Sequence, residues 1–304
     1  MSQTLYPETS RHSGFIKIIN KSLADLWFFL RTNRWTSFTS ETVRPMLILI
    51  HALALCAVFV RPTWKDLALF ISLYLATGFG ITVGFHRLLT HKGFDSPGWI
   101  TALLAFLGTA SMQGGPLWWV SVHRKHHQQS DRDADPHSPQ YGFIHGHMGW
   151  MFKKGGLESY PKLVRDLATN KFLVLLDSGP FSVVPWLTTI IACYLIDGFR
   201  GIVWGVGVRT VFVWHATWCV NSVCHRLGSK PHKLRDNSGN VWWVGLWALG
   251  EGWHNNHHAH PRAAIHEFHW WEVDLSAYFL RILESVGLIR NVVRAGPETE
   301  IQKG

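Results

Sequence analysis

The chain has 304 residues, of which 47% are hydrophobic and only 16% are charged, and 17 of them are tryptophan. A soluble domain usually has about 25% charged residues, and tryptophan is enriched at membrane interfaces, so the composition excludes an ordinary soluble domain and favours a membrane protein. The formal net charge of +9 suits an anionic lipid surface or head group. Because the sequence contains no nucleic-acid-binding motif, we expect no nucleic-acid partner.

We predict three parts along the chain. Residues 1–40 form an N-terminal segment in which apolar residues recur at helical spacing over residues 14–31, which predicts an amphipathic helix on the membrane surface. Residues 41–290 form the main membrane domain, and residues 291–304 form a polar tail.

Four apolar runs in the main domain predict transmembrane helices at about residues 43–60, 67–85, 181–199 and 202–223. The first run is short for a membrane span, which needs about 20 residues. Short turns at residues 61–66 and 197–200 join the four runs into two antiparallel hairpins.

A fifth apolar run, at residues 99–122, is predicted not to cross the membrane. A crossing would place the histidines at 86–91 and those at 123–127 on opposite sides. Gly114, Gly115 and Pro116 predict a break, so we expect this run to lie in the membrane plane or to enter and return. Residues 270–289 predict a second amphipathic helix.

Four crossings bring every histidine cluster to the same side, where Lys and Arg are concentrated. The positive-inside rule identifies this side as the cytoplasm, so we expect a multi-pass membrane protein with its active site and both termini there. The cysteines lie in apolar segments without CxxC spacing, so we predict buried thiols and no disulfides. They are Cys56, Cys193, Cys219 and Cys224.

Three histidine clusters indicate a metal centre, because neutral imidazole is a common ligand of iron, zinc and copper. Two clusters have histidines at i, i+3 and i+4, which places the imidazoles on one face of a helix, and the first cluster is a looser pair. The clusters are His86 and His91, then His123, His126 and His127, and finally His254, His257 and His258. Eight histidines exceed what one ion uses, so two metals are predicted. We expect Asp131, Asp133 and Asp135 to accept hydrogen bonds from ligand N–H groups.

Other polar residues near these clusters have less certain roles. For His225, which has Asn221 one turn before it, spacing supports a ligand role and a structural role equally. His51 and His215 lie inside spans, where polar side chains usually pair within the bundle, and Arg209 either pairs in the same way or extends outward. Asn255 and Asn256 are expected to point away from the metal and to be incidental to it. His145, His147, His260, His266 and His269 are expected to lie behind the ligands or at the surface.

The boxes HRLLTH, HRKHHQQSD and GEGWHNNHH resemble those of the membrane fatty acyl desaturases, the stearoyl-CoA (delta-9) type in particular. The flanking sequences DADPH at 133–137, GHMGW at 146–150, ATW at 216–218 and NSVCH at 221–225 are similar too. The resemblance runs from about residue 40 to residue 290. It implies an O2-dependent enzyme that introduces a cis double bond, at the delta-9 position, into a saturated acyl chain carried on CoA or a lipid.

The resemblance also implies the composition of the metal centre, in which nine histidines bind two iron ions and Asn221 contacts one iron through water. The implied ligands are His86, His91, His123, His126, His127, His225, His254, His257 and His258. No catalytic residue beyond these ligands is predicted. Because the sequence contains no haem-binding or flavin-binding module, a separate electron donor, ferredoxin or cytochrome b5-like, is expected. The predicted fold is therefore all-α, with four transmembrane helices in two hairpins under a cytoplasmic helical domain that holds two metals.

A bent tunnel for the acyl chain follows from the same resemblance. The residues that match the lining of its bend are Gln113, Trp119, Thr217 and Trp218. The candidates for holding the anionic end of the substrate are Arg124, Lys153 and Lys154, although solvated or lipid-facing charge explains the lysines equally well. Phe70 and Tyr74 lie on the same helix face as Gly78 and are expected to close the far end.

Two other functions stay open on these residues. A fatty acyl hydroxylase or another histidine-box oxygenase has the same spacing, because the same oxidant can transfer oxygen instead of removing a second hydrogen, although the flanking sequences favour desaturation. A zinc-binding membrane receptor or hydrolase is more remote, since one zinc ion takes three or four protein ligands. CoA, an acyl carrier protein and a glycerolipid are all compatible with the basic residues as the acyl carrier.

Overall fold

The computed structural model describes residues 40–295, so the amphipathic helix predicted at 14–31 lies outside the described residues. Within the described range every regular element is a helix, and loops meet only in isolated β-bridges, as the all-α prediction required. Two of these bridges join Arg290 to Asp95 and Arg294 to Ile265. The main domain therefore extends beyond residue 290, where the polar tail was predicted to begin.

The first hairpin consists of α2 (Ser40–Leu55), which ends in a 3₁₀ turn at Cys56–Val58, and α3 (Trp64–Phe79), which continues as the π-helix η2 (Gly80–Thr90). Thr63 and Asp66 form a capping box at the start of α3, where the Thr63 N–H donates to Asp66 Oδ2 at 2.7 Å. Such caps contribute about 1 kcal/mol. The capping box therefore fixes the point at which the turn predicted at 61–66 ends and α3 begins.

The second hairpin consists of α9 (Val184–Gly201), the π-helix η6 (Ile202–Val208) and α10 (Arg209–Ser222). Asp197 and Gly198 have non-helical backbone angles, with φ +56° at Gly198, so the chain turns where a turn was predicted. The two arms pack closely, because a Cβ atom on Gly201 would lie 2.2 Å from the Cys193 carbonyl oxygen. All four cysteines are free thiols; Cys193, Cys219 and Cys224 are buried, as predicted, whereas Cys56 is partly exposed.

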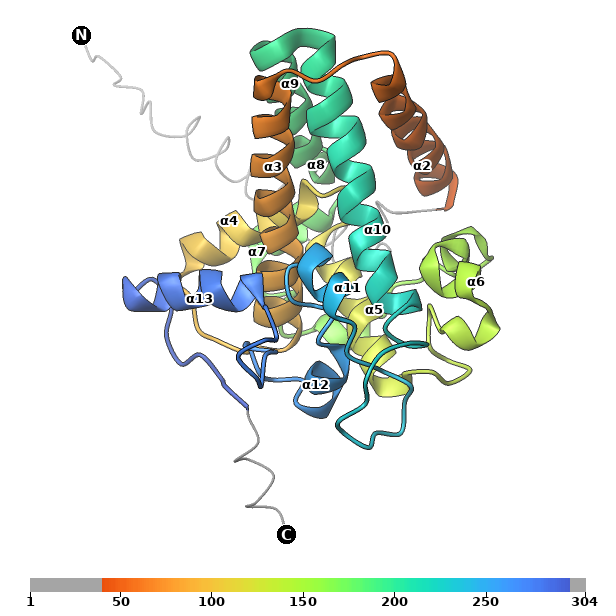
Figure 1. Cartoon of the computed structure of the whole chain (residues 1–304), viewed down its shortest axis with the longest axis vertical. Helices are drawn as coiled ribbons and strands as arrows, with labels where there is room; N and C mark the ends of the chain where they lie inside the picture. Colours follow the sequence, from red (N-terminus) through yellow and green to blue (C-terminus); the bar gives the residue numbers. More distant parts are fainter. Residues whose placement is uncertain (1–39, 296–304) are drawn as a thin grey trace, which may run out of the picture. The chain divides into compact units, whose positions relative to one another are not determined.

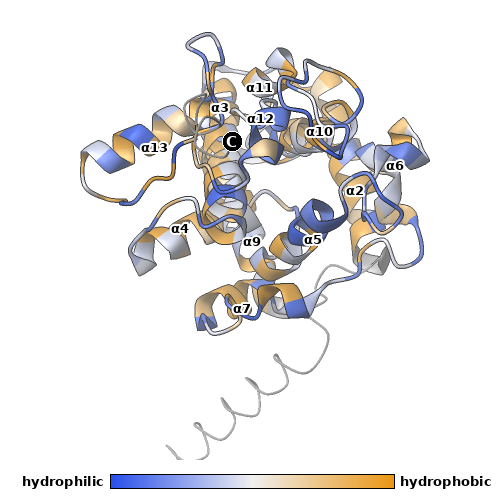
Figure 2. Ribbon diagram, turned by 90° about the horizontal axis from the view of Figure 1, so that it is seen from below, coloured by the Kyte–Doolittle hydropathy of each residue, from blue (hydrophilic) through white to orange (hydrophobic). Residues whose placement is uncertain are grey.

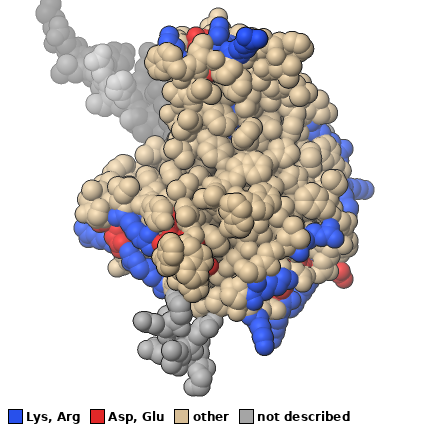
Figure 3. Space-filling model, viewed as in Figure 1, with Lys and Arg blue, Asp and Glu red and all other residues tan. Residues whose placement is uncertain are grey.

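Two of the described helices are long and apolar enough to cross a membrane, Trp64–Thr90 and Val184–Ser222, and Val43–Val58 and Gly98–Thr109 are shorter apolar helices. The face seen in Figure 3 has a broad uncharged area in its middle, with Lys and Arg at the top, along the right edge and across the lower part. This distribution fits association of the uncharged area with a membrane.

The run predicted to enter and return forms two helices, α4 (Gly98–Thr109) and α5 (Pro116–Gln129), with a buried break between them. At only 12 residues α4 is too short to span a bilayer. Its last carbonyls would lack partners in apolar surroundings, but side chains of the second hairpin donate to them. The donors are Trp186 Nε1 to Thr109 O at 2.7 Å, Arg209 Nη1 to Ala110 O at 3.3 Å and Trp214 Nε1 to Ser111 O at 3.0 Å. Arg209 thus pairs within the bundle.

The start of α5 is held by Asp177, the last residue of α7 (Lys171–Asp177). Its Oδ1 accepts the N–H groups of Leu117 and Trp118, both at 3.0 Å. A Cβ atom on Gly115 would lie 2.2 Å from the same oxygen, so only glycine permits this approach. Burial raises the pKa of Asp177 to about 7, against the opposing effect of the two N–H groups.

Shorter helices and loops gather around the lower part of the two hairpins (Figure 1). They include α6 (Phe143–His147), α11 (Trp242–Trp247), α12 (His254–Ala259) and α13 (Leu275–Ser285), with 3₁₀ turns at Pro139–Tyr141, Gly149–Phe152 and Pro161–Val164, and the short α8 (Gly179–Ser182) precedes α9. Seen from below, hydrophilic residues gather on α5 and around α12 (Figure 2). As predicted, α13 is amphipathic, since Ala277 and Leu280 are buried whereas Arg281 and Ser285 are exposed.

Candidate metal centre

All nine histidines selected from the sequence converge in two neighbouring groups, and within each group the ligand atoms lie within 4.8 Å of one another. The five-histidine group consists of His86, His91, His123, His127 and His257, and the four-histidine group consists of His126, His225, His254 and His258. His225, for which spacing alone was undecided, therefore belongs to the cluster.

Each HxxHH box contributes to both groups, whereas the spacing predicted that its three imidazoles would share one face. On α5, His123 and His127 stand one turn apart and join the five-histidine group, while His126 joins the other. On α12 the division is reversed, because His254 and His258 enter the four-histidine group and His257 enters the five-histidine group. Residues four apart lie one above the other on a helix, and an adjacent residue is turned by about 100°.

The first box depends on the π-helix that carries it. Residues five apart on an α-helix are rotated by about 140° from each other, so an α-helix would separate His86 from His91. In η2 the His91 N–H donates instead to the carbonyl oxygen of His86, five residues back, at 3.2 Å. A π-helix places these residues one turn apart, and the two ring centroids are 4.8 Å apart.

The environment favours the neutral form of several of these imidazoles, which is the form that binds a metal. Burial, followed by the neighbouring imidazoles, lowers the pKa of His123, His127 and His257 well below the usual value. Burial also lowers the pKa of His126, but the Asp135 carboxylate outweighs this effect and the net shift is upward.

Four of the ligands have a carboxylate against Nδ1. The pairs are His86 with Glu251 at 2.7 Å, His126 with Asp135 at 3.0 Å, His225 with Asp131 at 2.9 Å and His258 with Asp236 at 3.0 Å. A carboxylate in this position accepts the Nδ1 proton and leaves the lone pair of Nε2 free to bind a metal. Asp131 and Asp135 therefore lie as predicted, whereas Asp133 accepts the Tyr141 hydroxyl at 3.0 Å. Glu251 and Asp236 were missed, although Glu251 belongs to the third box.

The inward nitrogens are spaced as ligands of a common ion would be. Two nitrogens bound at about 2.1 Å and at right angles lie about 3.0 Å apart. The Nε2 atoms of His127 and His257 are 3.0 Å apart, and those of His225 and His254 are also 3.0 Å apart. Nε2 of His91 and of His258 are buried without a hydrogen-bond partner in the described structure. The donor set thus fits two transition-metal ions that accept imidazole nitrogen.

A buried ion network supports this set from behind. Arg87 is fully buried and donates to Glu251 Oε1 at 3.1 Å and to Asp274 Oδ2 at 2.9 Å. Despite burial, His86 and Arg87 lower the pKa of Glu251, so the carboxylate stays charged against the ligand. His266 lies behind the ligands, as expected, with Nδ1 3.6 Å from Glu251 Oε2.

Asn255 and Asn256 correct the expectation that they are incidental to the site. Both are buried, and Asn240 Oδ1 accepts their backbone N–H groups at 2.9 and 3.2 Å. The Asn256 amide donates to Glu272 at 3.0 Å, and the Asn255 amide donates to the carbonyl oxygens of His232 and Ser238. They point away from the ligands, but they fix α12 and hence its three histidines.

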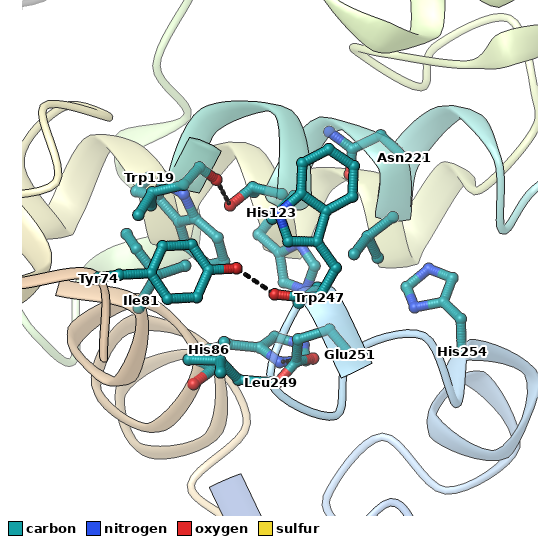
Figure 4. A pocket seen from close by; sticks show the side chains of 17 residues that line it. Tyr74, Ile81, His86, Trp119, His123, Asn221, Trp247, Leu249, Glu251 and His254 are labelled. Carbon is teal, nitrogen blue, oxygen red and sulfur yellow. Dashed lines mark hydrogen bonds and ion pairs between the residues drawn. The ribbon is translucent and has the colours of Figure 1, made fainter. Parts of the chain in front are cut away.

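Two adjoining cavities reach the histidines. The first is lined by Tyr74, Gly78, Trp119, His123, Thr217, Asn221 and others (Figure 4). The second is lined by Gln113, Trp119, Thr217, Trp218 and Asn221 among others. Gln113 Nε2 donates to Thr217 Oγ1 at 3.1 Å where the two cavities meet. The four residues predicted for the bend thus come together, and Tyr74 lies in the first cavity.

The cations proposed for the anionic end of the substrate line neither cavity. Arg124 bonds Asp166 at 2.8 Å and the carbonyl oxygens of Leu89 and Leu163, so its guanidinium joins the 163–166 turn to the first box. Lys153 lies over the Tyr141 ring, 4.9 Å from its centroid, and Lys154 is exposed. Arg124 therefore has a structural task that sequence alone did not indicate.

Comparison with known proteins agrees with this site. The model of the fatty acid desaturase family matches residues 62–281. A chloroplastic palmitoyl-monogalactosyldiacylglycerol delta-7 desaturase of Arabidopsis thaliana is 43% identical over 251 residues, 81% of this chain and 67% of the relative. An sn-1 stearoyl-lipid 9-desaturase of Synechocystis is 39% identical over 253 residues, 82% of this chain and 79% of the relative. An icosanoyl-CoA 5-desaturase of Limnanthes douglasii is 42% identical over 255 residues, 81% and 70% of the two chains.

Proposed function

Because this chain belongs to the fatty acid desaturase family and is an oxidoreductase that acts on acyl chains, we propose that it is an O2-dependent di-iron desaturase. It introduces a cis double bond at the delta-9 position of a saturated acyl chain carried on CoA or a lipid. The observation that carries this proposal is the pair of histidine groups, nine imidazoles beside two apolar cavities that meet at Thr217.

The overall reaction converts –CH2–CH2– and O2, with two electrons and two protons, into –CH=CH– and two water molecules. Iron bound by the nine histidines, with Asn221 contacting it through water, would supply the oxidation of the unactivated C–H bonds. The chain's own residues orient the reactants. The carboxylates Glu251, Asp131, Asp135 and Asp236 hold the Nδ1 protons, and the cavity walls exclude water.

The substrate is held by the residues around the bend. The Gln113–Thr217 hydrogen bond fixes the junction of the two cavities, with Trp119 and Trp218 as walls, so that one carbon pair faces His123 and His86. The delta-9 position is supported by the resemblance of the boxes and by relatives named as 9-desaturases, although other relatives are named as delta-7 and delta-5 desaturases. Lys153 and Lys154 stay candidates for the anionic end.

For the topology, we infer four crossings, with the histidine groups and both termini on the cytoplasmic side. The turns at Cys56–Val58 and at Asp197 and Gly198 lie at one end of the uncharged area, and the boxes lie at the other. Single cysteines introduced at Lys65 and Lys162 into a variant without the native cysteines should react with a membrane-impermeant reagent from opposite sides. Labelling of both from the same side would contradict this topology.

The decisive experiment is expression in a host that lacks unsaturated fatty acids, with mass spectrometry of each lipid pool. We expect a new double bond at one position in wild type and none in His257→Ala, which should also lose bound iron. An added hydroxyl group would identify a hydroxylase instead, and one zinc ion without iron would favour the receptor or hydrolase. The pool that first contains the double bond identifies the acyl carrier.

A further inference from the structure

The loop between α10 and α11 combines exposed cations with contacts to the metal centre. The loop, residues 226–237, lies at the bottom of Figure 1, and the turn between α9 and α10 lies at the top. Four cations of this loop are exposed, and none makes an ion pair with any described residue; they are Arg226, Lys230, Lys233 and Arg235. The apolar side chain of Leu227, in the same loop, is 60% exposed. The single acidic residue of the loop, Asp236, is turned inward to His258.

The inner face of the loop is fixed to the four-histidine group. Asp131 Oδ2 accepts the Asn237 N–H at 2.7 Å and also contacts His225 Nδ1 at 2.9 Å. Asp236 contacts His258 Nδ1 at 3.0 Å and is itself held by Ser238. The backbone of Ser229 pairs with Asn240, so the loop is braced at both ends. A protein bound to its outer face would therefore lie directly over two ligand–carboxylate pairs.

A cavity of about 240 Å³ leads from the cationic rim to a metal ligand. It is lined by Pro139, Gln140, His225, Arg226, Lys230 and Asn237. His225 lines the floor of this cavity with its side chain fully buried, and its Nε2 lies 3.0 Å from Nε2 of His254. The residue thus connects the metal group to the floor of the cavity.

We propose that loop 226–237 is the docking surface of the electron donor, a small protein with an acidic face, and that His225 marks the shortest route from this surface to the four-histidine group. This inference rests on the proposed function, in which each turnover takes two electrons from outside the chain. Each donor molecule is oxidised by one electron, and two such transfers supply the reducing equivalents that convert O2, with two protons and the two substrate hydrogens, to water. Unpaired cations around an apolar residue suit an acidic partner and accelerate its association.

The test uses the full-length enzyme in nanodiscs and Arg226→Glu/Lys230→Glu. With a purified ferredoxin and a purified cytochrome b5 as alternative donors, each with its reductase, we expect kcat/KM for the effective donor to fall about 10- to 100-fold at low salt. Wild type should show a decline of kcat/KM with salt that the variant lacks. Iron content and the single-turnover yield with dithionite should be unchanged, because the chemical reductant needs no docking.

The matched control is Lys162→Glu/Arg165→Glu, which makes the same change of charge at two exposed positions outside the loop. An equal loss in the control, or unchanged donor kinetics in the loop variant, would overturn the proposal. Loss of the dithionite yield would show that the loop is structural, and binding of the loop to anionic vesicles without an effect on donor kinetics would assign it to lipid. A wild-type enzyme that forms no double bond even with dithionite would instead refute the proposed function. Lys230→Glu alone serves if the double variant is not recovered.

Discussion

The length of the acyl chain that the enzyme accepts should depend on Tyr74. Its ring lines the first cavity, and its hydroxyl donates a hydrogen bond to the carbonyl oxygen of Trp247 (Figure 4). Phe70 is absent from that lining and stacks on Tyr74, with ring centroids 5.9 Å apart, while it meets Phe212 edge-on at 5.3 Å. The two residues were predicted to close the tunnel together. In the structure Tyr74 lines the first cavity, and Phe70 packs behind it.

Replacing Tyr74 by alanine should open the cavity toward Phe70 and admit chains longer by two methylene groups. Each methylene transferred from water to apolar surroundings contributes about 0.8 kcal/mol, so two contribute about 1.6 kcal/mol, about a 15-fold change in preference. Phe70→Ala should have a smaller effect, since Tyr74 still closes the cavity. Tyr74→Phe keeps the ring and loses only a hydrogen bond, about 1 kcal/mol of stability, so its chain-length preference should match wild type.

The assay is competition between saturated acyl chains of increasing length in one cell or one reaction, with product ratios measured by mass spectrometry. Ratios are insensitive to the amount of folded enzyme, which matters because removal of a buried aromatic ring costs about 3–5 kcal/mol. An unchanged chain-length profile in both Tyr74→Ala and Phe70→Ala would refute the reasoning. So would a shift in Tyr74→Phe as large as that in Tyr74→Ala.

Three further changes test other parts of the structure. Asp236→Asn should weaken iron retention about 10- to 100-fold in chelator competition, because the amide no longer accepts the His258 proton as a carboxylate does, and wild-type retention would contradict this. The pKa of Asp177 is raised by burial to about 7, so its contribution to stability is complete below its ordinary pKa and is lost as pH rises through 7. Asp177→Asn should therefore flatten the fall in unfolding temperature between about pH 4 and 8, and an unaltered slope would oppose the assignment. Arg209→Gln removes the hydrogen bond to the Ala110 carbonyl oxygen and so loosens the break at residues 110–115. We expect a lower unfolding temperature and double bonds at neighbouring positions of the acyl chain. Products with the double bond at a single position would contradict this expectation.

Sequence reasoning selected the histidines that converge in the structure, but it did not show how they are divided between the two groups. Spacing at i, i+3 and i+4 shows which imidazoles can share a helix face, yet it does not say where the partner helix places its own. In the structure α5 and α12 face each other, so His126 and His257 each cross to the group of the opposite box. The π-helix was equally hidden, because HxxxxH on an α-helix would not bring His86 to His91.

The supporting residues were harder to predict because their partners are distant in the chain. Asp236 and Glu251 carry no spacing signal relative to His258 and His86, from which they are 22 and 165 positions away. Arg124 lies inside a histidine box and was predicted to contact the substrate. In the structure its guanidinium donates a hydrogen bond to Asp166, which lies 42 residues later in the chain. The turns at 61–66 and 197–200 were predictable, since capping and glycine signals are local.

The buried charges near the apolar part of the fold share one physical task, which is to end helices where water does not reach. Asp66 caps the start of α3, Asp177 accepts the first N–H groups of α5, and Arg209 donates to the carbonyl oxygen of Ala110, which follows the last residue of α4. Each has the sign that complements the dipole of the helix end it contacts. Because α4 ends and α5 begins inside the fold, the chain turns back at the break between them. His123 then meets His86, with ring centroids 4.7 Å apart, as the proposed topology of four crossings requires. We therefore expect the geometry of the candidate metal centre to depend on Arg209 and Asp177, even though neither belongs to the two histidine groups.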